Sequence, residues 1–182
     1  MALRRLMSIR RLLVCLLALS ALASGGATAQ AVPEYELKAA FMYNFALFVE
    51  WPVDARKDAA FVLCVTGRGL FDAAFDALDG KPVRSQKLAV RKVDGMQGLD
   101  ECHMLYIAPA EEMRLNQILG LAGRRPILTV ADAEGWSGRG VMINLVTRQG
   151  RLAFDVNLDV VRRAGLDMSS RLLRLASSVN GR

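Results

Sequence analysis

The 182-residue sequence is poor in the residues that build metal centres and disulfide scaffolds. It contains three cysteines and one histidine. Three cysteines are too few for a disulfide-rich scaffold. A zinc site needs more thiolate or imidazole ligands than the adjacent pair Cys102 and His103 supplies. There is no C-x-x-C motif, which argues against a catalytic redox role. The sequence therefore predicts no bound metal and no cofactor.

Catalytic motifs are missing as well. Gly67-Arg68-Gly69 lies between a predicted strand and a predicted helix, where a dinucleotide-binding fingerprint would lie, but Asp72 stands in the place of the third glycine. His103 is accompanied by no nucleophile elbow or comparable motif. We therefore expect a protein that is not an enzyme. A cryptic hydrolase is the alternative, and it requires a pocket that holds His103 together with an acid and a hydroxyl group.

The chain also lacks a long linker, a low-complexity tract and an internal repeat. Its hydrophobic fraction of 53% is too high for a disordered chain. Its length suits one domain better than two. We expect a single domain over residues 33–178.

The excess of positive charge is concentrated at the N-terminus. The formal charge is +6, yet residues 1–11 carry four arginines and no acid. An apolar run at 12–23 and an A-x-A sequence at 27–29 follow. This order is typical of a secretory signal peptide, so we expect residues 1–29 to be cleaved off. The apolar run is short for a membrane anchor, which needs about twenty residues.

Cleavage changes what the charge implies. Removing 29 of the 182 residues, with four arginines and no acid, leaves 153 residues with a charge of +2. Binding to a nucleic-acid backbone requires many lysines and arginines that neutralise phosphates. We therefore expect no nucleic-acid partner.

The remaining sequence alternates between predicted strands and helices. Short apolar runs predict buried strands, and apolar residues at helical spacing predict helices between them. The expected strands are 61–66, 87–93, 102–108, 126–130, 141–147 and 151–156, and the expected helices are 34–50, 70–78, 110–121, 158–164 and a last one capped by Asp167 or Ser169. This order predicts a single-domain mixed α/β sandwich. Its sheet is mostly parallel and flanked by helices, with a C-terminal antiparallel β-hairpin.

Two cysteines remain after the expected cleavage. Cys64 and Cys102 lie in two apolar strands that a parallel sheet can place side by side. An even pair of cysteines in an exported protein can form a disulfide. We therefore predict a Cys64–Cys102 disulfide, with two buried and inert thiols as the alternative.

The first predicted helix is apolar around most of its circumference. Leu37, Phe41, Phe45 and Phe48 share one face, and a second apolar face runs beside it with a polar break at Lys38. Such a helix is buried on several sides or covered by a partner. A central core helix and a docking surface both fit this pattern.

Motifs along the chain resemble the YfiR family. The segment from Tyr35 to Pro52 resembles the opening motif of that family. Further resemblances follow in the family's order: FVLCVTG at 61–67, CHMLYI at 102–107, ILTV-x-D at 127–132, RLAFDVNL at 151–158 and RAGLDMSSRLLRLA at 163–176. Residues 136–140 depart from the pattern, because the resemblance leads us to expect a phenylalanine and adjacent glycines there.

The resemblance implies a periplasmic regulator that is not an enzyme. It implies binding to the periplasmic part of an inner-membrane diguanylate cyclase, which is held inactive, so that cyclic di-GMP and biofilm formation fall. It also implies a homodimer and, in systems that encode one, an outer-membrane lipoprotein that sequesters the repressor.

On this basis we hypothesise that the apolar helix and the C-terminal helix provide the docking surface. Excess apolar surface on the first and paired arginines on the second motivate the hypothesis. The candidate partner-binding residues are Phe41, Tyr43, Phe45, Phe48, Trp51, Arg171 and Arg174. The alternative function is a periplasmic sensor that binds a small molecule in a concave site at the strand ends of the sheet.

Overall fold

The computed structural model describes residues 33–54, 59–67, 72–94 and 96–181. The predicted signal peptide, residues 1–29, lies outside the described residues. Within the part that is described, no helix is both long and apolar enough to cross a membrane.

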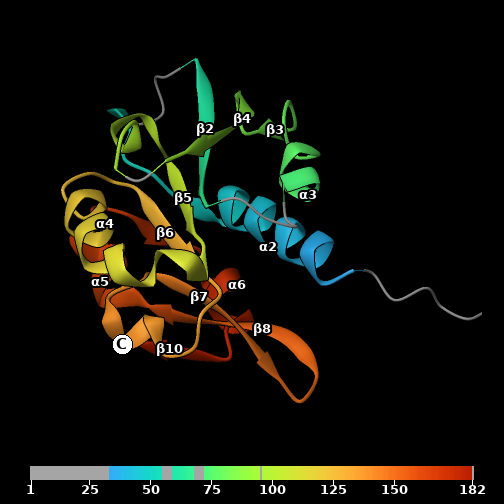
Figure 1. Cartoon of the computed structure of the whole chain (residues 1–182), viewed down its shortest axis with the longest axis vertical. Coiled ribbons are helices and arrows are strands. Elements are labelled where there is room, and N and C mark those ends of the chain that lie inside the picture. The colour runs from blue at the N-terminus through green and yellow to red at the C-terminus, as the bar shows by residue number, and fades with distance from the viewer. Residues whose placement is uncertain (1–32, 55–58, 68–71, 95, 182) are drawn as a thin grey trace, which may run out of the picture. The chain divides into compact units, whose positions relative to one another are not determined.

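An eight-stranded sheet forms the centre of the fold, in the order β10-β8-β7-β6-β5-β2-β4-β3 (Figure 1). The strands are β2 (Ala60–Thr66), β3 (Pro82–Val83), β4 (Gln86–Val93), β5 (Met104–Ile107), β6 (Leu128–Ala131), β7 (Ile143–Arg148), β8 (Arg151–Asn157) and β10 (Ser178–Asn180). Strands β4, β2, β5, β6 and β7 are parallel to one another, and β7 and β8 form an antiparallel hairpin. The predicted fold class, a mixed α/β fold with a mostly parallel sheet, is confirmed.

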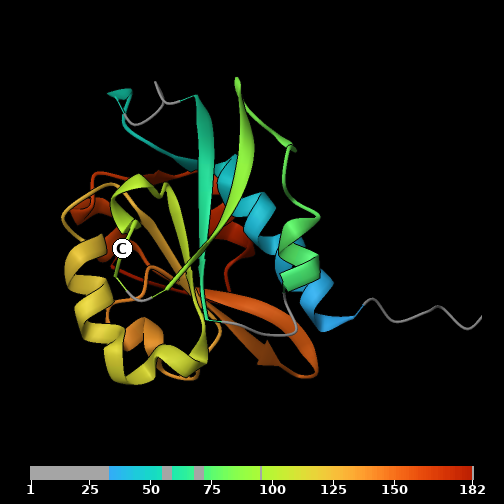
Figure 2. The same cartoon turned by 45° about the horizontal axis from the view of Figure 1, so that its top comes forward.

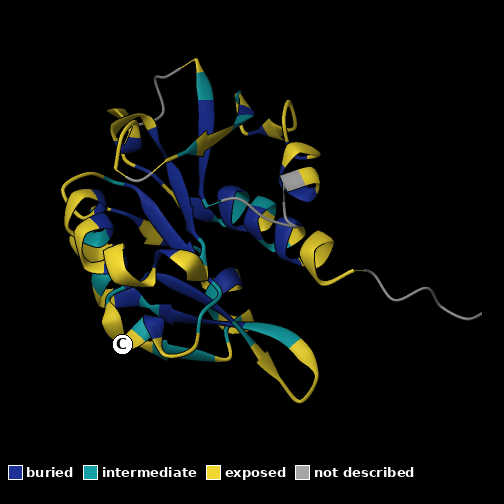
Figure 3. Ribbon diagram, viewed as in Figure 1, coloured by how far each residue is buried: buried dark blue, intermediate teal, exposed yellow. Residues whose placement is uncertain are grey.

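Helices cover both faces of the sheet, because parallel strands are joined by crossover connections that place helices there. Every residue of β5 and β6 is buried, as is every residue of β2 except Ala60. Near-continuous apolar runs of this kind suit strands that contact protein on both sides. Figure 3 shows the same contrast, with the central strands buried and the end of the β7–β8 hairpin exposed.

Two hydrophobic clusters lie on the two faces of the sheet. On one face the strands pack against α2 (Glu34–Phe48), α3 (Asp72–Asp76), α5 (Leu158–Arg163) and α6 (Ser170–Leu175). On the other face they pack against α4 (Leu115–Ala122) and the 3-10 helices η2 (Leu99–Glu101) and η4 (Trp136–Arg139). In Figure 2, α2 in blue and α4 in yellow lie on opposite sides of the sheet.

The first helix ends earlier than predicted. Helix α2 stops at Phe48 because Val49 is extended, with φ −87° and ψ 146°, and begins β1 (Val49–Glu50). Strand β1 pairs with β9 (Asp167–Met168), through Val49 with Met168. This two-residue ladder places the end of α2 directly beside the start of α6.

Other boundaries also differ from the prediction. The strand expected at 102–108 begins only at Met104, because the chain leaves η2 at Cys102. The helix expected at 110–121 begins as the 3-10 helix η3 (Pro109–Arg114) and becomes α-helical from Leu115. The helix expected at 70–78 is the short α3, and residues 70–71 lie outside the described residues.

Side-chain caps begin both C-terminal helices. The side chain of Asn157 accepts a hydrogen bond from the Val160 amide and so caps α5. Of the two candidates for the last helix, Ser169 is the cap, because its hydroxyl accepts from the Leu172 amide.

The segment 136–140 keeps a buried aromatic despite its unusual sequence. Trp136 is 3% exposed and packs in the cluster that contains α4. Gly135 and Gly140, with φ of 75° and 102°, flank the 3-10 helix and provide backbone conformations that other residues adopt only with strain. The tryptophan therefore occupies a core position in this loop.

Candidate functional site

Cys64 and Cys102 form a disulfide, as predicted from the sequence. Their Cα atoms are 5.7 Å apart, within the usual range for such a bridge. Both residues belong to the cluster packed against α4. The bridge therefore links β2 to the segment that leads into β5.

His103 serves the backbone of the sheet. Its Nδ1 accepts a hydrogen bond from the Val62 amide at 3.1 Å, and its ring stacks on Phe61 with centroids 5.0 Å apart. Acids from Asp54, Asp100 and Glu101 line the cavity beside it, but none of the described residues lining that cavity carries a hydroxyl side chain. The hydrolase alternative requires a hydroxyl nucleophile that this arrangement does not supply.

The structure separates the predicted partner-binding residues into buried and accessible ones. Phe45 is fully buried against Phe154, with ring centroids 5.1 Å apart. Trp51 is also buried, and its Nε1 donates to the His103 carbonyl at 3.1 Å. These two side chains pack the core and offer no surface to a partner in this conformation. Phe41, Tyr43 and Phe48 are partly exposed, and Arg171 and Arg174 are exposed.

Helices α2 and α6 meet through Arg171 and Phe48, and Phe41, Arg174 and Leu175 lie at helical spacing from these two residues. The guanidinium carbon of Arg171 lies 5.4 Å from the centroid of the Phe48 ring, and the Ser169 amide donates to the Phe48 carbonyl at 3.1 Å. Leu175, one turn after Arg171, is 67% exposed. We call this surface the α2–α6 face, made of Phe41, Phe48, Arg171, Arg174 and Leu175.

Tyr43 lies elsewhere on α2. Its hydroxyl donates to the Pro82 carbonyl at 2.7 Å, and Lys81 lies over its ring at 5.4 Å. It therefore joins α2 to the segment around β3 and does not belong to the α2–α6 face.

A cleft of about 610 Å³ lies beyond the carboxyl end of β6. One wall is the first turn of α2, and the other is the part of the β7–β8 hairpin that continues past β6. Both lie on the same side of the molecule in Figures 1 and 2. Ligands of open α/β sheets bind outside the carboxyl ends of the strands, where the small-molecule sensor alternative also places its site. The polar side chains that line the cleft include Glu34, Lys38, Asp132, Glu134, Asn144, Arg148 and Asp155.

A buried ion pair lies at the junction of α2 and β6. The Nζ of Lys38 lies 2.7 Å from the Asp132 carboxylate and 2.7 Å from Glu34. The Lys38 and Asp132 side chains are 10% and 5% exposed, whereas Glu34 is mostly exposed. Burial lowers the pKa of Lys38, but its hydrogen bonds to Asp132 and Glu34 and their charges outweigh burial, so the pKa lies above its ordinary value.

Tyr106 of β5 is coupled to the same pair. Burial raises the pKa of its hydroxyl well above the ordinary range, and the charge of Asp132 and a hydrogen bond to it add to this shift. The hydroxyl therefore stays protonated beside the Asp132 carboxylate. A lysine, a tyrosine and an aspartate from three different elements thus meet behind the cleft.

The hairpin wall carries a second polar group. Arg148 donates to both oxygens of the Asp155 carboxylate, at 3.2 and 2.9 Å. Asn144 is 1% exposed, and its Nδ2 donates to the Ala133 carbonyl at 2.8 Å. Its Oδ1 is buried without a hydrogen-bond donor among the described residues.

The sequence contains a weak signal for this cleft. Lys38 is a single cation within a strongly apolar helix, and Asp132 directly follows a buried parallel strand. Only the fold shows that the two meet. Across the ranges that the structure describes, no three His, Cys, Asp or Glu side chains gather as a group that could hold a metal ion.

Comparison with a solved structure supports the fold. A conserved domain protein from Vibrio cholerae O1 biovar El Tor superimposes with a TM-score of 0.57 at 9% sequence identity. The match covers 81% of this chain and 60% of the Vibrio cholerae chain. At this identity the likeness concerns the fold alone.

The sequence model of the YfiR/HmsC-like family matches residues 35–177. This span contains both α2 and α6, the disulfide and the cleft, and it covers most of the chain. The chain therefore belongs to the YfiR/HmsC-like family.

Proposed function

We propose that this protein represses an inner-membrane diguanylate cyclase by binding the periplasmic part of that enzyme through the α2–α6 face. Repression lowers cyclic di-GMP and biofilm formation. Residues 1–29 act as a signal peptide that directs secretion to the periplasm and is cleaved off. The mature protein acts as a homodimer without catalytic activity. An outer-membrane lipoprotein sequesters it where one is encoded.

The observation that carries this proposal is the contact between the two helices. Arg171 lies over Phe48, and Leu175 beside it is 67% exposed. Apolar side chains bordered by arginines are typical of protein-binding surfaces, in which aromatic residues and arginine are enriched. The arginines favour a partner segment that carries acidic side chains.

Charge reversal tests the surface directly. The double substitution Arg171→Glu and Arg174→Glu should relieve repression, because both side chains are exposed and their loss leaves the core unchanged. The measurement is cellular cyclic di-GMP in a strain that expresses the protein together with an inner-membrane diguanylate cyclase that the unsubstituted protein represses.

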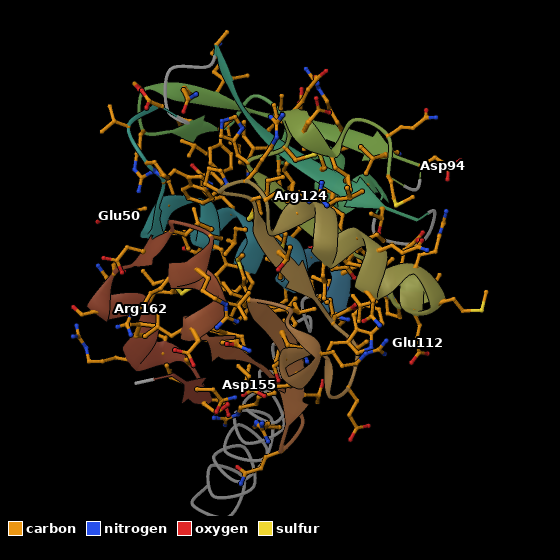
Figure 4. The ribbon with its side chains drawn as sticks, turned by 90° about the vertical axis from the view of Figure 1, so that its left-hand side faces the viewer. Glu50, Asp94, Glu112, Arg124, Asp155 and Arg162 are labelled. Atoms are coloured by element: carbon orange, nitrogen blue, oxygen red, sulfur yellow. A yellow bond between two sulfur atoms is a disulfide. The ribbon has the colours of Figure 1, made fainter. Side chains whose placement is uncertain are left out.

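A matched control changes two other exposed arginines. Arg124→Glu with Arg125→Glu alters the net charge equally, and both residues follow α4 on the other face of the sheet. Figure 4 labels Arg124. Secreted amounts and circular dichroism spectra should match the unsubstituted protein for both variants. If the Arg171/Arg174 variant is folded and secreted but represses fully, the α2–α6 face is not the docking surface.

A further inference from the structure

The cleft contains a strand edge that is not paired with any strand of the described residues. Strand β6 ends at Ala131, which pairs with Asn144 of β7. Strand β7 continues through Leu145–Arg148, and among the described residues these four pair only with β8. All four also line the cleft. Alternate backbone N–H and C=O groups of this edge therefore face the cleft without a ladder partner.

Two side-chain contacts fix the chain where β6 ends. Asn144 of β7 donates to the Ala133 carbonyl at 2.8 Å, and the Lys38 ammonium of α2 lies 2.7 Å from the Asp132 carboxylate. These contacts hold residues 132–133 at the end of the β6–β7 ladder, and no residue of β6 pairs with Leu145–Arg148.

The dimensions suit a short extended segment. Four residues of a strand span about 13 Å at roughly 3.3 Å per residue. The cleft volume of about 610 Å³ lies within the range of specific ligand sites. A segment placed beside Leu145–Arg148 would occupy the position that a longer β6 would have taken.

The charge of the cleft indicates the chemistry of that segment. Four acids, Glu34, Asp132, Glu134 and Asp155, line it with two bases, Lys38 and Arg148. Both bases are already engaged with acids. Glu134 is exposed and forms no ion pair with any other described residue. The buried Oδ1 of Asn144 adds an acceptor that lacks a donor within the described part of the chain.

We infer that this cleft binds an extended, basic segment of another protein, which adds to the sheet as a strand along the Leu145–Arg148 edge of β7. Hydrogen bonds to the open edge supply sequence-independent affinity, as in other cases of strand addition. A lysine or arginine of the segment pairs with Glu134. A small amine could form ion pairs with the acids of the cleft, but it could not form backbone hydrogen bonds with the edge of β7. The open edge therefore favours a peptide as the ligand.

Short synthetic peptides test this inference on the purified protein. The probe is the acetylated and amidated hexapeptide KVTVKV, compared with EVTVEV and with KVTVKV methylated at alternate backbone nitrogens. Affinity is measured by calorimetric titration, and the bound site by amide hydrogen exchange of the protein. We expect KVTVKV to slow exchange within 143–148 and to bind about tenfold more tightly than EVTVEV. The methylated peptide should not bind, because it cannot form the ladder.

Two substitutions supply the controls. Glu134→Lys should reverse the preference between the lysine and glutamate peptides and leave the fold intact, since Glu134 is exposed. Asp94→Lys makes the same charge change at an exposed residue well away from Asp155 of the cleft (Figure 4), and it should leave the preference unchanged.

Several results would overturn the inference. The methylated peptide could bind as tightly as KVTVKV, or no peptide could bind at millimolar concentration. KVTVKV could slow amide hydrogen exchange only outside the β7 segment. Spermidine could also displace KVTVKV fully while amide exchange in β7 is not slowed at all. Concentration-dependent dimerisation that protects residues 143–148 in the absence of peptide would assign the edge to a second copy of the chain and would also contradict it.

Discussion

Loss of the Lys38 ammonium should destabilise the protein more than loss of its partner carboxylate. In Lys38→Met, Asp132 keeps a charge that is 5% exposed and has no other cation within salt-bridge distance among the described residues. Removing one partner of a buried ion pair costs about 3–5 kcal/mol, and the hydrogen bond between Tyr106 and Asp132 favours the lower end of that range. In a domain of this size that corresponds to a fall in Tm of roughly 6–20 °C.

Asp132→Asn should cost less because Lys38 retains a second partner. Glu34 lies 2.7 Å from the Lys38 Nζ and is itself mostly exposed, so it remains well solvated and charged. The lost charge-assisted hydrogen bond then costs about 1–3 kcal/mol. Lys38→Met should therefore lower the free energy of unfolding more than Asp132→Asn does, because Lys38 has two carboxylate partners and Asp132 has one ammonium partner among the described residues.

Urea unfolding of the two single variants and the double variant measures the interaction. The free energy lost in the double variant should be smaller than the sum of the single losses by at least about 1 kcal/mol, since the two side chains are in contact. Unchanged m values would show that the unfolded states are comparable. Strict additivity, or a larger loss for Asp132→Asn than for Lys38→Met, would refute this account of the pair.

Two further predictions concern the disulfide and alkaline pH. Replacing Cys64 and Cys102 by alanine should lower the free energy of unfolding by about 4 kcal/mol, because the disulfide joins residues 38 positions apart. The measurement is urea unfolding without reductant. A change below about 1 kcal/mol would show that the disulfide constrains the unfolded chain little. The pKa values of Lys38 and Tyr106 are raised in the folded protein, so the unfolded chain loses these protons first. Stability should be constant up to about pH 10 and then fall, by at most about 1.4 kcal/mol per pH unit for each group. Tyr106→Phe should flatten that decline between pH 10 and 12, and an unaltered slope would exclude Tyr106 as its source.

The parts of the fold that could be predicted are those with long patterns. The buried runs of β2, β5 and β6 and the β7–β8 hairpin carry enough apolar residues to be recognised locally. Strands β1, β3, β9 and β10 have two or three residues each, which is too short for a periodicity to be read. Their pairing depends on neighbours that are distant in the sequence.

The cleft was beyond prediction for a related reason. In the sequence, Lys38 is a polar break in an apolar helix and Asp132 is the last residue of a strand motif. The two are separated by 94 positions, and only the packing of α2 across the sheet brings them together. Likewise, apolar spacing places Phe45 and Phe48 on one helical face, but the position of Phe154 decides that Phe45 is buried.

The two-residue ladder between β1 and β9 has a consequence for the cost of association. Backbone hydrogen bonds, and not side-chain packing alone, fix the start of α6 against the end of α2, since β1 pairs with β9 and the Ser169 amide bonds the Phe48 carbonyl. Arg171 already rests on Phe48 before any partner arrives. Ordering a long side chain at an interface costs about 0.5–1.5 kcal/mol. Under the proposed function, the entropy of ordering Arg171 is therefore lost largely during folding, and less of it is lost when a partner binds.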